Sequence, residues 1–288
     1  MSAATFSPRQ LAFRLFSSSI LIALVLGTIF RFPLWIFFVV VTAVALIGLY
    51  EFFAMARHRG VMVPRTLGLT LGFMLLLLVA RRTLFAAVPE ATTLAAWAYD
   101  IFWPAAVVML FLRQLGRTNT FEALEAVAVA VFGLAYVPGL LSWLFHLRSW
   151  PDGSGPWLVC YLILVTKMGD AGAYAVGNVI GRRPLIPRIS PGKTIEGFIG
   201  AMLASGAAGA TAHRMVPWLD GSAAGGFLLG LVLGLVGLGG DLAESLLKRD
   251  CKVKDASGLF PGLGGMLDIL DSLLFTAPVF YAILSYAA

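Results

Sequence analysis

Long apolar runs, separated by short polar stretches, repeat along the chain. Each run is close to the roughly 20 residues that a helix needs to cross about 30 Å of hydrocarbon. The pattern therefore predicts an all-α polytopic membrane protein with about nine transmembrane helices. We place these spans near residues 11–30, 33–53, 66–80, 93–112, 122–146, 156–179, 195–212, 223–247 and 266–285.

The composition supports this class of protein. Hydrophobic residues make up 59% of the 288 residues and charged residues only 12%, whereas soluble domains typically contain about 25% charged residues. A soluble globular enzyme is therefore excluded. The net charge of +6 is explained largely by topology and by attraction to anionic lipids, and we expect no nucleic-acid partner.

Lys and Arg residues are distributed unevenly between alternate loops, and such residues accumulate in short cytoplasmic loops. Of the 21 in the chain, one set of loops holds 15, and Lys167 lies inside a span. This asymmetry predicts a multi-pass protein of the inner (cytoplasmic) membrane with a cytoplasmic N-terminus. The alternate set holds only Arg31, Arg81, Arg82, Arg148 and Arg214.

The turn-rich segment 150–155 divides the chain into two predicted halves. Residues 1–150 contain about five spans and no catalytic constellation, so we interpret them as a transmembrane scaffold. Three glutamates lie at the ends of these spans, where we expect a solvated or headgroup-level role: Glu51, Glu122 and Glu125. Residues 151–288 contain about four spans and a cytoplasmic-facing polar site, and form the predicted catalytic half.

Four carboxylates lie at the facing ends of the last two spans, namely Asp241, Glu244, Asp268 and Asp271. Three- and four-residue steps put the first two on one helical stripe with Lys248. Each charge at mid-bilayer costs roughly 2.5–3.5 kcal/mol, so these groups must face a polar cavity. Oxygen ligands without His or Cys favour Mg²⁺ over zinc.

A second polar region lies upstream, at the end of the sixth span and in the basic loop after it. Lys167 and Asp170 are three residues apart and close enough to pair, either as a structural ion pair or as part of a site. Ser190 and Pro191 match the N-cap and first position of a helix. Such a helix start with Lys193 is a natural phosphate site, although a capped helix with topological charges is the simpler alternative.

Both polar regions resemble the phosphatidate cytidylyltransferase family, also called CDP-diacylglycerol synthase, over about the last 120 residues. The upstream family motif is matched by Asp170, Ala173, Tyr174, Gly177, Ile189, Ser190, Pro191, Lys193, Thr194, Glu196 and Gly197. The downstream motif is matched by Ser245, Lys248, Arg249, Lys254, Asp255, Ser257, Phe260, Pro261, Gly264, Gly265, Asp268 and Asp271.

The resemblance implies a homodimeric enzyme that converts CTP and phosphatidic acid to CDP-diacylglycerol and pyrophosphate. We expect Asp268 and Asp271 to hold Mg²⁺, helped by Asp241 or Glu244. The expected phosphate-binding residues are Lys248, Arg249, Lys193 and Ser190, and Asp170 is expected to shape the pocket. The remaining candidates for substrate binding are Tyr174, Thr194, Glu196, Ser245, Lys254, Asp255, Gly264 and Gly265.

Two positions depart from the family motif: Leu263 replaces a His and Ile269 replaces an Arg. These departures keep open an inactive or weakly active regulatory paralogue. Two further alternatives are a CTP-using enzyme for another lipid phosphate and an ion-coupled transporter, because intramembrane charges also mark ion pathways. A transporter of that kind would show paired repeats, and no internal repeat is visible.

Overall fold

The computed structural model describes residues 24–84, 89–116, 122–216, 222–260 and 264–287. Within these ranges, eight helical segments are long and apolar enough to cross a membrane, which confirms the all-α polytopic class. The first predicted span, 11–30, lies largely outside the described residues. The helices are α2 (Leu34–His58), α3 (Arg65–Leu84), α4 (Pro89–Leu115), α5 (Ala123–Leu134), α6 (Trp143–Arg148), α7 (Gly155–Ile180), α8 (Ile195–Ala212), α9 (Ala223–Asp250) and α10 (Met266–Ala287).

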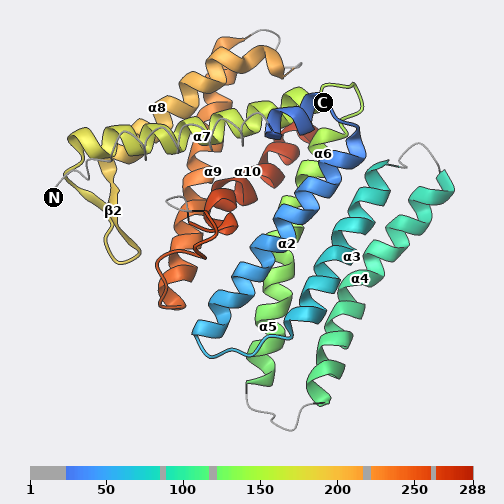
Figure 1. Ribbon diagram of the computed structural model, residues 1–288. Helices are drawn as coiled ribbons and strands as arrows, with labels where there is room; N and C mark the ends of the chain where they lie inside the picture. Colours follow the sequence, from blue (N-terminus) through green and yellow to red (C-terminus); the bar gives the residue numbers. More distant parts are fainter. Residues whose placement is uncertain (1–23, 85–88, 117–121, 217–221, 261–263, 288) are drawn as a thin grey trace.

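The helices form two groups that meet at α10. Helices α2, α3 and α4 pack side by side with α5, while α8 packs between α7 and α9. Figure 1 shows α7 running across the molecule, at a clear inclination to α2 and α3. Helix α10 packs against α9 and α7 on one side and against α2 and α6 on the other. Its position makes α10 the element that both groups share.

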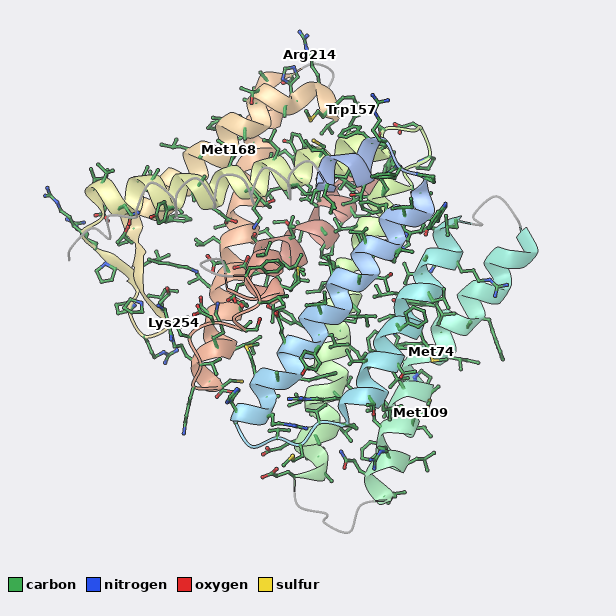
Figure 2. The ribbon with its side chains drawn as sticks, in the orientation of Figure 1. Met74, Met109, Trp157, Met168, Arg214 and Lys254 are labelled. Carbon is green, nitrogen blue, oxygen red and sulfur yellow. The ribbon has the colours of Figure 1, made fainter. Side chains whose placement is uncertain are left out.

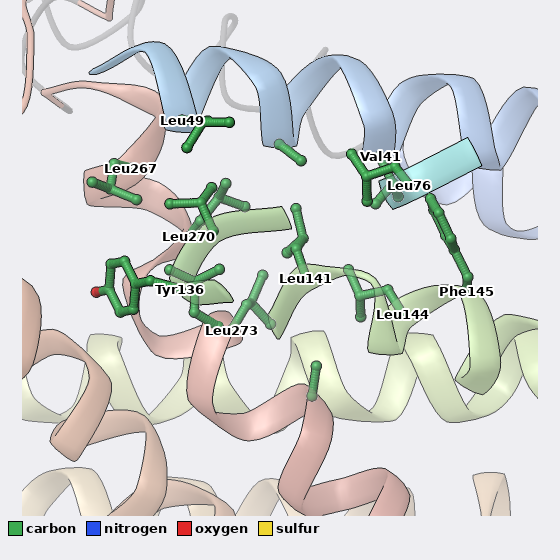
Figure 3. Close-up of a cluster of buried hydrophobic side chains, with 14 of the residues drawn as sticks. Val41, Leu49, Leu76, Tyr136, Leu141, Leu144, Phe145, Leu267, Leu270 and Leu273 are labelled. Atoms are coloured by element: carbon green, nitrogen blue, oxygen red, sulfur yellow. The ribbon is translucent and has the colours of Figure 1, made fainter. Parts of the chain in front are cut away.

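A single apolar core joins α10 to the N-terminal helices. Leu49 of α2 lies over Leu267 of α10, and Leu270 and Leu273 extend the contact toward α5 and α6 (Figure 3). Lipid tails solvate leucine about as well as another leucine does, so close packing, rather than transfer from water, favours this association. This packing fixes the position of α10 along the length of α2.

Glycines bring α8 and α9 into backbone contact. A methyl group added at Gly226 would collide with the Gly209 carbonyl, and one added at Gly230 would collide with the Ser205 carbonyl. Gly226, Gly230 and Gly234, at four-residue spacing, therefore form a close-packing stripe on α9.

A β-hairpin replaces the helix start predicted at Ser190. Strands β1 (Pro184–Ile186) and β2 (Ser190–Thr194) are antiparallel, and α8 begins only at Ile195. The true N-cap is Thr194, whose hydroxyl accepts a hydrogen bond from the Gly197 N–H at 3.1 Å. The Ser190 prediction was wrong because Ser followed by Pro is also compatible with an extended strand that starts a hairpin.

The two ends of the bundle carry different loops. Figure 2 shows Lys254, in the loop between α9 and α10, at the end that also carries the hairpin, whereas Arg214 lies at the opposite end of α8. The polar residues of the hairpin and of the α9–α10 loop (residues 251–265) therefore gather at one end of the molecule. This is the end predicted to be cytoplasmic.

Candidate functional site

Three carboxylates converge between α9 and α10. Oxygen atoms of Asp241, Glu244 and Asp271 all lie within 4.8 Å of one another. Glu244 is fully buried and Asp271 is 7% exposed, so water screens their mutual repulsion poorly. Among the described residues, this is the group whose spacing and ligand atoms suit a metal ion.

The fourth carboxylate, Asp268, is held by hydrogen bonds. Its Oδ1 lies 2.5 Å from Lys248 Nζ, and its Oδ2 accepts from the N–H groups of Gly265 at 2.6 Å and Ala256 at 3.0 Å. Lys248 also lies 2.5 Å from Glu244. Lys248 therefore links the carboxylate stripe of α9 to the start of α10, and Asp268 closes the α9–α10 loop onto its own helix.

Charge in this region does not balance. Asp241, Glu244, Asp268 and Asp271 face the ammonium groups of Lys248 and Lys193, the latter 2.6 Å from Asp241. Four carboxylates against two ammonium groups leave a formal excess of two negative charges when all are ionised. In a poorly screened site, such an excess favours either proton uptake or a divalent cation.

Glycines allow the helices and the loop to approach this cluster. A methyl group at Gly240 would collide with the Asp271 carbonyl, so α9 and α10 touch beside the carboxylates. Gly264 has φ +88°, and a methyl group there would lie within 2.9 Å of the Asp268 carboxyl carbon. Gly264 is therefore required both by its backbone conformation and by the space that Asp268 occupies.

A pocket of about 260 Å³ opens beside the cluster, between α7, α8, α9 and the hairpin. Asp241 and Lys193 line it together with Asp170, Tyr174 and Thr194. Residues of the upstream motif therefore meet Asp241, one of the three clustered carboxylates, at one cavity, although about 70 residues separate Asp170 from Asp241. The pocket combines the ammonium group of Lys193, the carboxylates of Asp170 and Asp241, and Tyr174, which is 73% exposed.

Lys167 pairs with Asp170 as predicted, at 2.9 Å, and it makes two further contacts. Its ammonium group donates to the carbonyl of Ile269 at 3.0 Å and to the Ser272 hydroxyl at 3.2 Å. The Ser272 hydroxyl also lies 3.4 Å from Asp170. Lys167 thereby connects α7 to the first turns of α10 and puts a positive charge beside position 269, where the family motif has an Arg.

Other residues predicted for the site make contacts away from the carboxylate cluster. Glu196 accepts hydrogen bonds from the N–H groups of Arg182 and Arg183 at 3.0 and 3.2 Å, which anchors the hairpin to α8. Arg249 donates to the carbonyl of Ile189 at 3.2 Å and joins α9 to the hairpin. Three more have surface or packing positions: Lys254 and Asp255 are exposed and Ser245 is buried.

Two residues of the N-terminal half reach the site without having been predicted there. Glu51 is 3% exposed, so the expectation of a solvated or headgroup-level role was wrong. Tyr136 lies in a π-helical turn (Ala135–Gly139), its ring faces Phe275 of α10, and its hydroxyl is buried without a hydrogen-bond partner. No local pattern marks either residue, because their burial depends on how α2 and the π-helical turn pack against α10.

Comparisons with known proteins agree with this site. Residues 12–287 match the cytidylyltransferase family. The chain is 32% identical over 249 residues to the phosphatidate cytidylyltransferase of Bacillus subtilis (strain 168), covering 86% of this chain and 88% of that protein. It is also 32% identical over 294 residues to the phosphatidate cytidylyltransferase of Synechocystis sp., covering 91% and 94%.

A shorter match has higher identity. The chain is 38% identical over 158 residues to the "Uncharacterized protein YnbB" of Escherichia coli (strain K12), and this match covers 55% of the chain and 51% of that protein. The family match and the two long alignments extend over nearly all of the described helices. The chain therefore belongs to the cytidylyltransferase family, and it is a nucleotidyltransferase embedded in a membrane.

Proposed function

We propose that this protein is a phosphatidate cytidylyltransferase, which converts CTP and phosphatidic acid to CDP-diacylglycerol and pyrophosphate with Mg²⁺. The observation that carries the proposal is the convergence of Asp241, Glu244 and Asp271 beside a pocket lined by Lys193. The names of the two long-matching relatives support the same reaction. The resemblance further supports a homodimer that works at the inner face of the cytoplasmic membrane.

The donor set of the carboxylate cluster fits Mg²⁺. Asp241, Glu244 and Asp271 offer oxygen ligands only, and the formal excess of two negative charges matches a divalent cation. Asp268, expected from the sequence to hold the metal with Asp271, has its carboxylate engaged by Lys248 and two backbone N–H groups. We therefore propose Asp241, Glu244 and Asp271 as the residues that hold the ion, with Asp268 beside them.

The proposed reaction needs charge neutralisation and alignment rather than a strong base. A phosphate oxygen of the lipid attacks the α-phosphorus of CTP, a new P–O bond forms, and the bond to the β-phosphate oxygen breaks to release pyrophosphate. A phosphomonoester has a second pKa near 6 and is mostly ionised at pH 7, so no residue must remove a proton. When bound, Mg²⁺ would neutralise the triphosphate and stabilise the leaving group.

The chain's own residues supply binding and orientation. Lys193 lines the pocket and is the proposed contact for a phosphate group of CTP, since a Lys ammonium acts as a point charge for phosphates. Lys248 holds Glu244 and Asp268 in place. Lys167 and Asp170 tie α7 to α10, so the wall of the pocket and the carboxylates keep one relative position.

The direct test is turnover by the purified protein in detergent. CTP-dependent conversion of phosphatidic acid should require Mg²⁺, should stop when the ion is chelated, and should be lost in Asp271→Asn, which keeps the side-chain volume. Glu125→Gln, an equivalent change at an exposed glutamate of α5, should leave turnover unchanged. Well-folded protein without turnover would contradict the proposal for this substrate.

The identity of the lipid acceptor is the second arm of that test. Leu263 and Ile269 depart from the family motif. An isoprenoid phosphate should therefore be assayed beside phosphatidic acid. Transfer from CTP to the isoprenoid phosphate alone would replace the proposed acceptor, while activity that appears only after Leu263→His and Ile269→Arg would indicate an inactive paralogue.

A further inference from the structure

We propose that Glu51 of α2 is a positioning residue for the nucleotidyl transfer, because it holds the first turn of α10, and with it the carboxylates, in the orientation that the reaction needs. The inference rests on the function proposed above. It gives the N-terminal half of the molecule a part in positioning the carboxylates of the candidate site.

The contacts of Glu51 all lie on the α9–α10 loop and the start of α10. Its Oε1 accepts from the Ser257 hydroxyl at 2.5 Å and from the Met266 N–H at 3.0 Å, and its Oε2 accepts from the Leu267 N–H at 2.8 Å. These residues are more than 200 positions away in the sequence. Each carboxylate oxygen therefore has at least one donor, and every donor belongs to the segment that leads into the candidate site.

The helix start explains why a carboxylate is needed there. The first N–H groups of a helix have no partner within the helix, and the N-terminus carries a partial positive charge that favours an anion. At α10, Glu51 satisfies Met266 and Leu267, while Asp268 accepts from Gly265. Two carboxylates thus share the start of α10, one from the helix itself and one from α2.

The loop leaves space for this arrangement. A methyl group added at Gly265 would lie only 2.7–2.9 Å from the carboxylate atoms of Glu51. Any larger residue at this position would force the carboxylate away from the Met266 and Leu267 N–H groups. The second glycine of the loop pair is therefore required by Glu51, just as Gly264 is required by Asp268.

Packing limits how far α2 and α10 can shift against each other. Leu49, two residues before Glu51, packs in the same core as Leu267 and Leu270 (Figure 3). Gly48 brings the α2 backbone close to the side chains of Leu267 and Leu270. The apolar contacts fix the separation of the helices, and the hydrogen bonds of Glu51 fix the rotation and register of the first α10 turn.

The rotation of this turn controls the candidate site. Asp268 and Asp271 lie one and four residues after Leu267, whose N–H group Glu51 binds, so a shift of the turn moves both carboxylates. Misplacement of reacting groups by about 1 Å can cost roughly a hundredfold in rate. Substrate binding at Lys193, on the hairpin side of the pocket, depends less on this turn.

The test combines steady-state kinetics with amide hydrogen exchange on the full-length protein in detergent. Glu51→Gln keeps the side-chain size but replaces one acceptor oxygen with an NH₂ group that faces an N–H donor. We expect kcat to fall by about a hundredfold and the KM for CTP to stay close to its original value. Exchange should become faster in residues 256–270 and stay unchanged in α3, α4 and α8.

Two further variants make the result specific. Glu51→Asp retains the charge on a shorter side chain, so part of the lost kcat should return relative to Glu51→Gln. Glu125→Gln carries the same change at the exposed glutamate of α5 and should alter neither kcat nor exchange. Local loss of protection together with a fall in kcat, partly rescued by Asp, supports the positioning role.

Other results would overturn it. Unchanged kcat in Glu51→Gln despite faster exchange in residues 256–270 would show that the hydrogen bonds of Glu51 do not affect the reaction. Faster exchange throughout the bundle would show that Glu51 stabilises the whole fold and has no specific positioning role. If the unmodified protein transfers no nucleotide to any lipid phosphate, the proposed function fails independently. The positioning role is then overturned with it, even if exchange shows that Glu51 holds α10.

Discussion

Helices α2–α6 and helices α7–α10 bury different kinds of side chain. Among the described residues, the first group buries one carboxylate, Glu51, among mostly apolar side chains, whereas the second buries Glu244 and Asp271 and places Asp241 beside them. The second group also carries ion pairs that join the hairpin to α9 and α9 to α10, besides pairs within α7 and within α9.

The difference shows how a mostly apolar membrane protein can support a charged site. In the second group, two Lys ammonium groups pair with four carboxylates, so two formal negative charges remain unpaired and are available for a cation. The charge in the first group is satisfied completely by donors from the second, through Ser257, Met266 and Leu267. One half thus supplies the charged residues of the candidate site, and the other half binds the start of one helix of that half through Glu51.

The largest expected effect comes from the carboxylate cluster. Asp241→Asn removes one of three negative charges that lie within 4.8 Å of each other, so turnover should fall by roughly a hundredfold and half-maximal activity should need more Mg²⁺. The matched control is Asp100→Asn, the same change at an exposed aspartate of α4. Superimposable Mg²⁺ titrations of the Asp241 variant and the unmodified protein would exclude Asp241 as a ligand.

A smaller effect is expected on the hairpin side of the pocket. Lys193→Met removes the ammonium group that pairs with Asp241, and a phosphate contact made equally in the ground and transition states acts mainly on KM. We expect the KM for CTP to rise by about tenfold, equivalent to about 1.4 kcal/mol of binding energy. Arg214→Met, at the opposite end of the molecule, is the control, and a change in kcat alone would contradict the assignment.

The smallest effect is expected in the N-terminal half, at Tyr136. Its hydroxyl is buried without a hydrogen-bond partner, so Tyr136→Phe removes an unsatisfied polar group, and the free energy of unfolding should increase by about 1 kcal/mol. Turnover should stay close to that of the unmodified protein. Denaturation in detergent measures the first quantity, and a large loss of activity would show that the first group contributes directly to the chemistry.

Regular spacing made much of the second group predictable. Asp241, Glu244 and Lys248 recur at three- and four-residue steps, and the structure places all three on one face of α9, where Lys248 contacts Glu244. The Lys167–Asp170 pair follows the same rule. Apolar run length likewise predicted the eight spans within the described residues, because a bilayer imposes its thickness on every helix that crosses it.

The features that were not predictable depend on contacts between distant segments. Glu51 looks like a span-end glutamate until α10 packs against it, and its three donors come from residues 257–267. The hairpin was missed because the residues around Ser190 satisfy the local preferences of a capped helix and of a strand equally well. Pairing of Ser190 with Ile186 decides between them.

The separation of Glu51 from its donors has a consequence for biogenesis. Helix α2 enters the membrane early in synthesis, but the Met266 N–H group that it binds is made 215 residues later. Until then the glutamate lacks its partners, and an unpaired carboxylate in a bilayer costs a few kcal/mol. Arrival of α10 removes this cost, so α2 reaches its final packing only after α10 has been made.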